Sequence, residues 1–170
     1  MSFDISSCGG LMQRHIDWLT GNGVPMSAII RPSPIRFARG HRAIDGRFEH
    51  DPNGYDWFVF SEATDLIFWR PGTDELATLD GRAFAINETM IDAASTYSFG
   101  HCLHVFESPL DWLRAARDGC VVVNWRLAFD RLRYCPRIAI AESLLPIYDR
   151  HMTPVLPELF ILRRRRETAA

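Results

Sequence analysis

Strand and helix patterns alternate along His101–Leu162, and this alternation constrains the fold more than any other feature of the chain. The apolar runs HCLHVF, CVVV, RIAI and ELFIL are separated by amphipathic stretches with helical spacing. Such alternation is typical of a parallel sheet with helices packed on its faces. We therefore expect a parallel βαβαβαβ arrangement over residues 101–162, in the manner of a Rossmann-like fold.

The first hundred residues carry a different pattern. Residues 10–20 place apolar side chains at helical spacing and are followed by Gly21-Asn22-Gly23, a helix stop. Runs with strand composition follow at residues 26–30, 35–38, 47–50, 57–60, 66–69 and 76–78. Turn dipeptides such as Asp45-Gly46 separate them, which favours an antiparallel sheet. A short helix is expected at residues 87–94, and the whole chain is expected to be α/β, or α+β overall.

The pattern changes near Gly100, where turn dipeptides become rare. This change predicts a helix plus antiparallel portion at residues 1–100, an α/β portion at 101–162 and a basic tail at 163–170. No low-complexity linker separates the first two portions. We therefore expect them to pack together.

All of the 19 basic residues are arginine, and the formal net charge is only −2. The chain has no general basic field of the kind that drives non-specific binding to nucleic acid. The dense basic run is Arg163, Arg164, Arg165 and Arg166. It is interpreted first as a solvated tail, with binding of nucleic acid or another partner as the alternative.

Hydropathy and cysteine content indicate the compartment. No apolar run approaches the roughly 20 residues that span a bilayer, so no membrane partner is expected. The N-terminal residues lack the order of a signal peptide, which favours a cytoplasmic protein. The four cysteines show no CxxC spacing and are interpreted as reduced, buried side chains. The sequence leaves the oligomeric state open.

Acidic residues follow two of the predicted parallel strands. Glu107 ends the first strand, and Glu142 comes just after RIAI. Sites in parallel sheets lie at the carboxyl ends of strands. The structural alternatives are a solvated strand end for Glu107 and a helix start for Glu142, with Ser143 as its cap. Asp111 follows the helix start Ser108-Pro109 and is interpreted first as a capping residue.

The segment LHVFESPLDWLRAARDGCVVVN resembles the toprim domain of primases, topoisomerases and related nucleases. Glu107 matches the strand-end glutamate of that family, Asp111 the acid in the next helix and Gly119 the glycine before the second strand. Ser108 stands where toprim-bearing phage and plasmid primases commonly have glycine. The family's Asp-x-Asp pair, which with the glutamate holds magnesium, is replaced here by Ala141-Glu142-Ser143.

The resemblance implies a toprim-like fold over about the last seventy residues. The chain is also similar to uncharacterised proteins of alphaproteobacterial plasmids and prophages, which implies a mobile-element setting. No histidine pair has metal-ligand spacing, and no GxSxG or phosphate-binding glycine loop is present. We therefore expect no metal site and no cofactor, with magnesium required only if the toprim-type chemistry is retained.

Aromatic residues crowd the antiparallel portion, among them Trp57 and Trp69. A core role is favoured for these rings, with stacking against a partner as the alternative. Their neighbours Asp56, Glu62 and Asp65 are acidic, so an exposed face here would suit a protein better than a phosphate backbone.

The leading hypothesis is a non-catalytic, toprim-like accessory protein of a mobile element. It would bind a protein or nucleic acid in replication or in phage–host conflict. The first alternative is a magnesium-dependent nicking or primer-synthesis enzyme that uses Glu107, Asp111 and Glu142 as catalytic residues. The second is an inhibitor or adaptor of a host immune complex.

Overall fold

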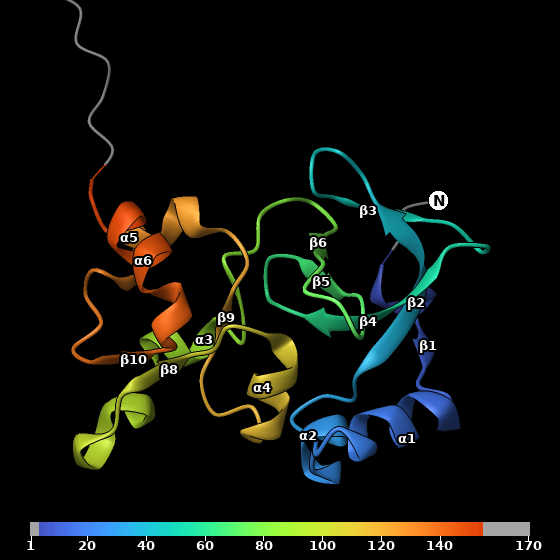
Figure 1. Ribbon diagram of the computed structural model, residues 1–170, viewed down its shortest axis with the longest axis horizontal. Helices are drawn as coiled ribbons and strands as arrows, with labels where there is room; N and C mark the ends of the chain where they lie inside the picture. The colour runs from blue at the N-terminus through green and yellow to red at the C-terminus, as the bar shows by residue number, and fades with distance from the viewer. Residues whose placement is uncertain (1–3, 155–170) are drawn as a thin grey trace, which may run out of the picture.

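The computed structural model describes residues 4–154, which form a mixed α+β fold. A six-stranded antiparallel sheet fills one side of the molecule, with strand order β1-β2-β4-β5-β6 and β3 paired to β2 (Figure 1). Its strands are β1 (Gly9–Gly10), β2 (Arg36–Arg42), β3 (Phe48–His50), β4 (Tyr55–Ser61), β5 (Leu66–Trp69) and β6 (Leu76–Thr78). The expected antiparallel portion is therefore confirmed.

Two helices lie beside each other near one end of this sheet, α1 (Gln13–Gly21) and α2 (Met26–Ile30) (Figure 1). The strand expected at residues 26–30 is wrong, because this segment is helical and buries Ala28 and Ile29 on one side. A run of five residues is too short for its apolar pattern to separate the two periodicities.

The elements after β6 are all short, and from residue 101 onward the helices and strands follow the expected order. The strands are β7 (Ala85–Ile86), β8 (Leu103–Val105), β9 (Val121–Val122) and β10 (Ile138–Ile140). The α-helices are α3 (Thr89–Asp92), α4 (Pro109–Arg114), α5 (Ala128–Leu132) and α6 (Leu145–His151). Short 3₁₀ segments lie at Ile5–Ser7, Ala94–Gly100, Trp125–Leu127 and Glu142–Leu144.

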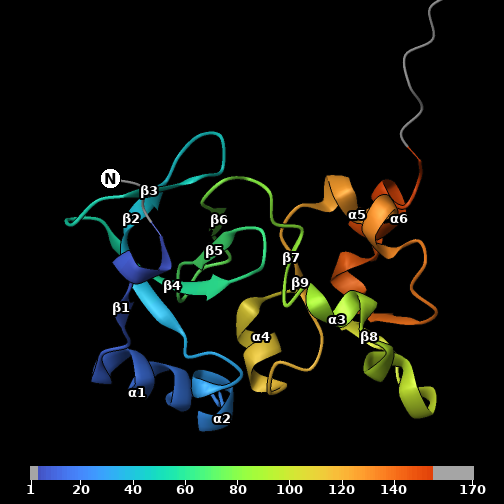
Figure 2. The ribbon, with the colours of Figure 1, turned by 180° about the vertical axis from the view of Figure 1, so that it is seen from behind.

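The pairing of these strands departs from the expected parallel βαβαβαβ sheet. In the part of the chain that the structure describes, β8 and β10 form a two-stranded parallel sheet, and one parallel bridge joins Val105 to Cys120. The other edge of β9 is taken by β7, which runs antiparallel to it (Figure 2). The strand β7, which precedes residue 100, thus occupies the edge of β9 on which the expected sheet would have placed a parallel strand. The last expected strand, at 158–162, lies outside the described residues.

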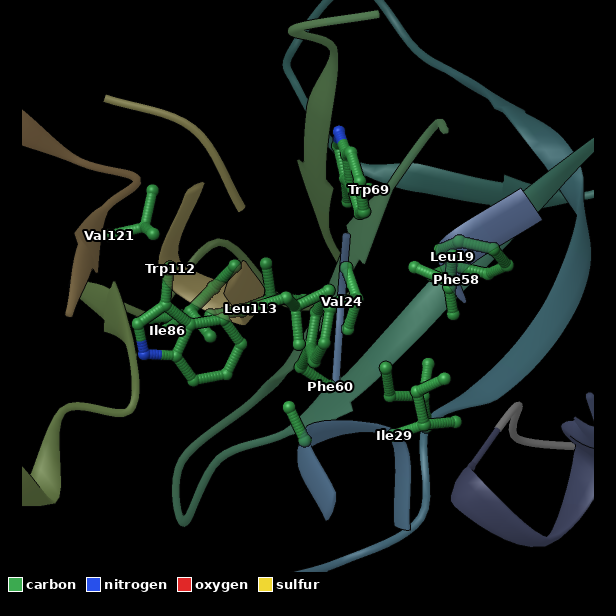
Figure 3. Close-up of a cluster of buried hydrophobic side chains, with 14 residues drawn as sticks. Leu19, Val24, Ile29, Phe58, Phe60, Trp69, Ile86, Trp112, Leu113 and Val121 are labelled. Carbon is green, nitrogen blue, oxygen red and sulfur yellow. The ribbon is translucent and has the colours of Figure 1, made fainter. Parts of the chain in front are cut away.

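The largest hydrophobic cluster joins the two halves of the chain. Leu19, Phe58 and Phe60 of the first half meet Trp112 and Leu113 of α4 in this cluster (Figure 3). The rings of Phe60 and Trp112 meet edge to face with centroids 5.5 Å apart. The expectation that the halves pack together is therefore confirmed. No helix among residues 4–154 is long and apolar enough to cross a membrane.

Candidate functional site

Glu107 and Glu142 lie at matching positions beyond two paired parallel strands. Val105 of β8 is registered with Ile140 of β10, and each glutamate follows its strand by two residues. Both residues are exposed. The structure therefore places these two acids at the same end of the small sheet, beyond the carboxyl ends of its two strands.

Asp111 is engaged within its own helix. The Ser108 hydroxyl donates a 2.8 Å hydrogen bond to Oδ2 of Asp111 and accepts a 3.2 Å bond from the Asp111 N–H. Arg114 Nη1 donates a 3.0 Å bond to Oδ1 of the same carboxylate. The capping interpretation of Ser108 and Asp111 is confirmed. The capping role expected of Ser143 is wrong, because the 3₁₀ segment begins at Glu142 and its N-cap is Ala141.

These acids do not form the ligand set that the toprim resemblance implies. Within residues 4–154, no group of three or more His, Cys, Asp or Glu side chains is placed to hold a metal ion. Each carboxylate oxygen of Asp111 accepts a hydrogen bond, one from Ser108 and one from Arg114. The residues present do not fit a three-carboxylate magnesium centre.

Trp57 and Trp69 are buried in the antiparallel half. Trp57 is 1% exposed and Trp69 2%, and each indole N–H donates to a backbone carbonyl, of Gly40 and Thr73 respectively. Neither ring presents a face on which a partner can stack. Arg163, Arg164, Arg165 and Arg166 lie outside the described residues.

The acidic neighbours of the aromatic residues are used inside the chain. Asp56 accepts hydrogen bonds from Arg14, His15 and Arg39. Although burial acts in the opposite direction, these bonds lower the pKa of Asp56 to about 2. Within residues 4–154, the hydrogen bonds that Asp65 and Glu62 accept come from backbone N–H groups. These three acids are therefore engaged in contacts within the chain.

A polar cluster that the sequence does not reveal lies where the two halves meet. Glu62, in the turn after β4, accepts hydrogen bonds from the N–H groups of Asn87 at 2.7 Å and Glu88 at 3.2 Å. The Asn87 side-chain amide donates to the carbonyls of Arg117 at 3.1 Å and Gly119 at 2.9 Å. The cluster ties the β4–β5 turn, the start of α3 and the loop after α4 together.

The backbone of this cluster is held in unusual conformations. Asn87, Ala116 and Arg117 have φ values of 61°, 53° and 65°, in the left-handed region that side chains other than glycine rarely adopt. Gly119 has φ 122°, and a Cβ atom there would lie 2.3 Å from the carbonyl oxygen of His104. The glycine before the second strand is thus required for the loop to pass β8.

Arg117 reaches back toward the first half. Its Nε donates a 2.7 Å hydrogen bond to the carbonyl of Ala28, and its guanidinium carbon lies 5.4 Å from the ring centroid of Trp112. Its Nη2 atom is buried and has no hydrogen-bond partner among residues 4–154. Burial lowers the pKa of Arg117 to about 10, against the opposing effect of the nearby Glu62 charge.

Burial also raises the pKa of Glu62 to about 7, which outweighs the hydrogen bond from Asn87 and the charge of Arg117. Glu62 and Arg117 line one pocket of about 160 Å³, together with residues from the α2–β2 connection, β4 and α4. Perturbed ionisable groups in a pocket between two parts of a chain are typical of functional sites.

A larger open groove of about 690 Å³ lies elsewhere, along the β2–β3 and β5–β6 turns. Its charged side chains carry both signs, and those of Arg42, Asp45, Asp74 and Arg126 belong to exposed residues. Such groups are well solvated. We therefore regard the smaller pocket as the stronger candidate.

Sequence reasoning could not have found Glu62 and Arg117. Each stands in a turn without a motif, and the two are brought together only when the loop after α4 folds against the β4–β5 turn. Comparisons with protein-family models, curated proteins and solved structures found no match for this chain.

Proposed function

We propose that this chain is a non-catalytic, toprim-like accessory protein of a mobile genetic element, which acts by binding a macromolecular partner in replication or phage–host conflict. One observation supports the non-catalytic assignment: among residues 4–154, no group of three His, Cys, Asp or Glu side chains is placed to hold a metal ion. The carboxylate of Asp111 instead accepts hydrogen bonds from Ser108 and Arg114.

A protein partner is favoured over nucleic acid by the way arginines are distributed. Arg39, Arg47, Arg82 and Arg131 each pair with a nearby carboxylate, as several other arginines among residues 4–154 do. Arginines neutralised in this way supply little field for a phosphate backbone. Binding of nucleic acid would then fall to Arg163–Arg166, and inhibition of a host immune complex is one form that protein binding could take.

The magnesium enzyme is kept as a second candidate on one specific observation. The register of β8 and β10 places Glu107 and Glu142 at the same end of this parallel strand pair. Two carboxylates at the carboxyl ends of neighbouring strands could bind a magnesium ion, with substrate phosphates as further ligands.

The two candidates are separated by a titration of the full chain with Mg²⁺ and Mn²⁺ at millimolar concentration. The same chain is assayed for nicking of supercoiled plasmid and for primer synthesis, beside a Glu107→Gln variant. A Glu49→Gln variant is the control, since Glu49 is an exposed acid in the other half, paired with His41. We expect no saturable metal binding and no activity. A metal-dependent activity that Glu107→Gln abolishes and Glu49→Gln retains would overturn the non-catalytic assignment.

A further inference from the structure

The antiparallel sheet ends at β6, and one edge of this strand has no partner strand among residues 4–154. β6 is the last strand in the order β1-β2-β4-β5-β6, and β5 pairs with its other edge. The N–H of Leu79 donates to the carbonyl of Leu66 in β5. Because main-chain groups alternate between the two edges of a strand, those of Leu76 and Thr78 face the outer edge.

This outer edge is only partly used within the chain. The N–H of Thr78 donates a 3.3 Å hydrogen bond to the carbonyl of Gly46 in the β2–β3 turn. Among residues 4–154, the main chain of Leu76 makes no hydrogen bond across this edge. Unpaired main-chain groups at the edge of a sheet can pair with an added strand.

The open groove of about 690 Å³ runs along this edge. Its lining includes Leu76, Ala77 and Thr78 of β6, the β2–β3 turn and the segment after β9. Its solvated side chains make it a poor site for a small molecule. An extended peptide does not need an enclosed pocket, because main-chain hydrogen bonds to the strand edge supply much of its affinity. The groove is therefore better suited to a peptide segment.

Two arginines that line the groove have no acidic partner. Arg42 ends β2 and Arg126 lies in the 3₁₀ segment after β9, and both are exposed. Their side chains make no ion pair or hydrogen bond among residues 4–154, unlike most arginines in this range. A Cβ atom on Gly46 would lie 3.3 Å from Nη2 of Arg42, so this guanidinium lies beside the turn that contacts β6.

The acidic side chains of the groove do not cancel this charge. Asp45 pairs with Arg47 at 3.4 Å, and Glu75 pairs with Arg70 at 3.1 Å. Asp74 is the acid of the groove that makes no ion pair within residues 4–154. Two unpaired arginines thus stand against one unpaired aspartate. The groove is complementary to a segment that carries acidic side chains.

We propose that this groove binds an extended, acidic segment of a protein partner by strand addition to β6. The main chain of the segment bonds to the outer edge at Leu76, and its acidic side chains pair with Arg42 and Arg126. This inference rests on the proposed function in taking the partner to be a protein, and it adds the surface and the chemistry of that partner.

A polynucleotide fits the groove less well. Its backbone has no N–H groups to pair with a strand edge, and its regularly spaced phosphates would also meet Asp74. Ile44 lies between Arg42 and Asp45 in the same turn and is fully exposed. An exposed apolar side chain beside the groove suits a protein better than a phosphate backbone.

The test begins with a displayed library of random peptides of about twelve residues, selected on the immobilised full chain. We expect the enriched sequences to alternate acidic with apolar residues. A synthetic, fluorescein-labelled peptide of the most enriched sequence is then the probe, and its affinity is measured by fluorescence anisotropy.

Variants of the full chain locate the bound probe. Arg42→Gln and Arg126→Gln are each expected to weaken its binding about tenfold, because each removes a charge-assisted hydrogen bond. Arg150→Gln is the matched control and is expected to leave the affinity unchanged. Arg150 is also exposed and makes no ion pair within residues 4–154, but it does not line the groove.

N-methylation of the probe at single positions tests strand addition. A methyl group on an N–H that faces β6 removes a donor and is expected to abolish binding. A methyl group on the intervening residues, whose N–H groups point away from β6, is expected to leave the binding intact.

Several results would overturn this inference. They are the enrichment of basic sequences or of none, binding that both arginine substitutions leave unchanged, and binding that tolerates N-methylation at every position. A labelled single-stranded oligonucleotide that binds more tightly than the probe and depends on Arg42 would assign the groove to nucleic acid. A dimer in sedimentation experiments that Arg42→Gln disrupts would assign it to a second copy of the chain.

These failures are distinguishable from a failure of the proposed function. The non-catalytic assignment is tested separately, by metal titration and the activity assays. Peptides that are enriched but bind with the same affinity to Arg42→Gln and Arg126→Gln would preserve a protein partner and remove only this surface.

Discussion

Glu62 illustrates how a single residue can serve the fold and still be poised to titrate. It accepts two backbone N–H groups at the start of α3, which would favour a charged carboxylate. Its burial between the β4–β5 turn and Arg117 has the larger effect and raises its pKa from 4.5 to about 7. The folded chain therefore holds a proton on Glu62 at pH values at which the unfolded chain has released it.

This difference predicts how the stability depends on pH. The contribution of Glu62 is fully present below its unfolded pKa of 4.5 and is lost as the pH rises through about 7. The upper limit of the effect is on the order of 3 kcal/mol in the free energy of unfolding. Urea unfolding of the wild type and Glu62→Gln at pH 5 and pH 8 measures it. Between pH 5 and pH 8, we expect the free energy of unfolding of the wild type to fall relative to that of Glu62→Gln. A Glu142→Gln control retains Glu62 and is therefore expected to show the same pH dependence as the wild type.

At the scale of elements, Asp65 organises the connection that leaves β6. One carboxylate oxygen accepts the N–H groups of Leu66 and Asp80, and the other accepts those of Arg82 and Ala83. Asp65 is only 8% exposed. This side chain thus fixes the segment that carries the chain from the antiparallel sheet to β7.

The substitution Asp65→Asn replaces one acceptor oxygen with an NH₂ group that faces two N–H donors. We expect a loss of about 3 kcal/mol in the free energy of unfolding, because two bonds to a charged group are lost and buried donors are left unpaired. Asp80→Asn is the matched control in the same turn, since the Asp80 carboxylate pairs with Arg82 at the surface. Chemical unfolding of both variants measures the difference. An equal loss in the two variants would show that Asp65 has no special role.

Strand and helix patterns predicted the elements better than their pairing. The expected strands at 66–69 and 76–78 coincide with β5 and β6, since each is bounded by turn residues. The parallel sheet expected after residue 100 was not formed as such, because β7 pairs with β9 from outside that region. Periodicity shows which face of a segment is buried, whereas the partner of a strand edge depends on contacts distant in sequence.

The same limit applies to the candidate site, where local features could be predicted and contacts between distant segments could not. The cap at Ser108 and Asp111 was predictable because it is local, and the strand-end positions of Glu107 and Glu142 followed from the order of the elements. The meeting of Glu62 with Arg117 was not predictable, because it depends on left-handed residues in a loop and on packing between distant segments.

At the scale of the whole molecule, the change of pattern near Gly100 is not a boundary of the core. Trp112, Leu113 and Val121 belong to the same hydrophobic cluster as residues of α1, α2 and the antiparallel sheet. The hydrogen bonds from Asn87 to Arg117 and Gly119 also cross this point. The chain is thus expected to unfold as one cooperative unit.

Cutting the chain after Gly100 tests this expectation. A fragment of residues 1–100 would expose the surface of Phe60 that meets Trp112 and would leave β7 without β9. Losing several buried apolar side chains at about 2 kcal/mol each exceeds the usual stability of a small domain. We therefore expect the fragment to lack dispersed amide resonances, and the intact chain to show coincident urea transitions by tryptophan fluorescence and circular dichroism. A well-dispersed spectrum from the isolated fragment would mean that residues 1–100 fold independently and that α4 only covers a finished core.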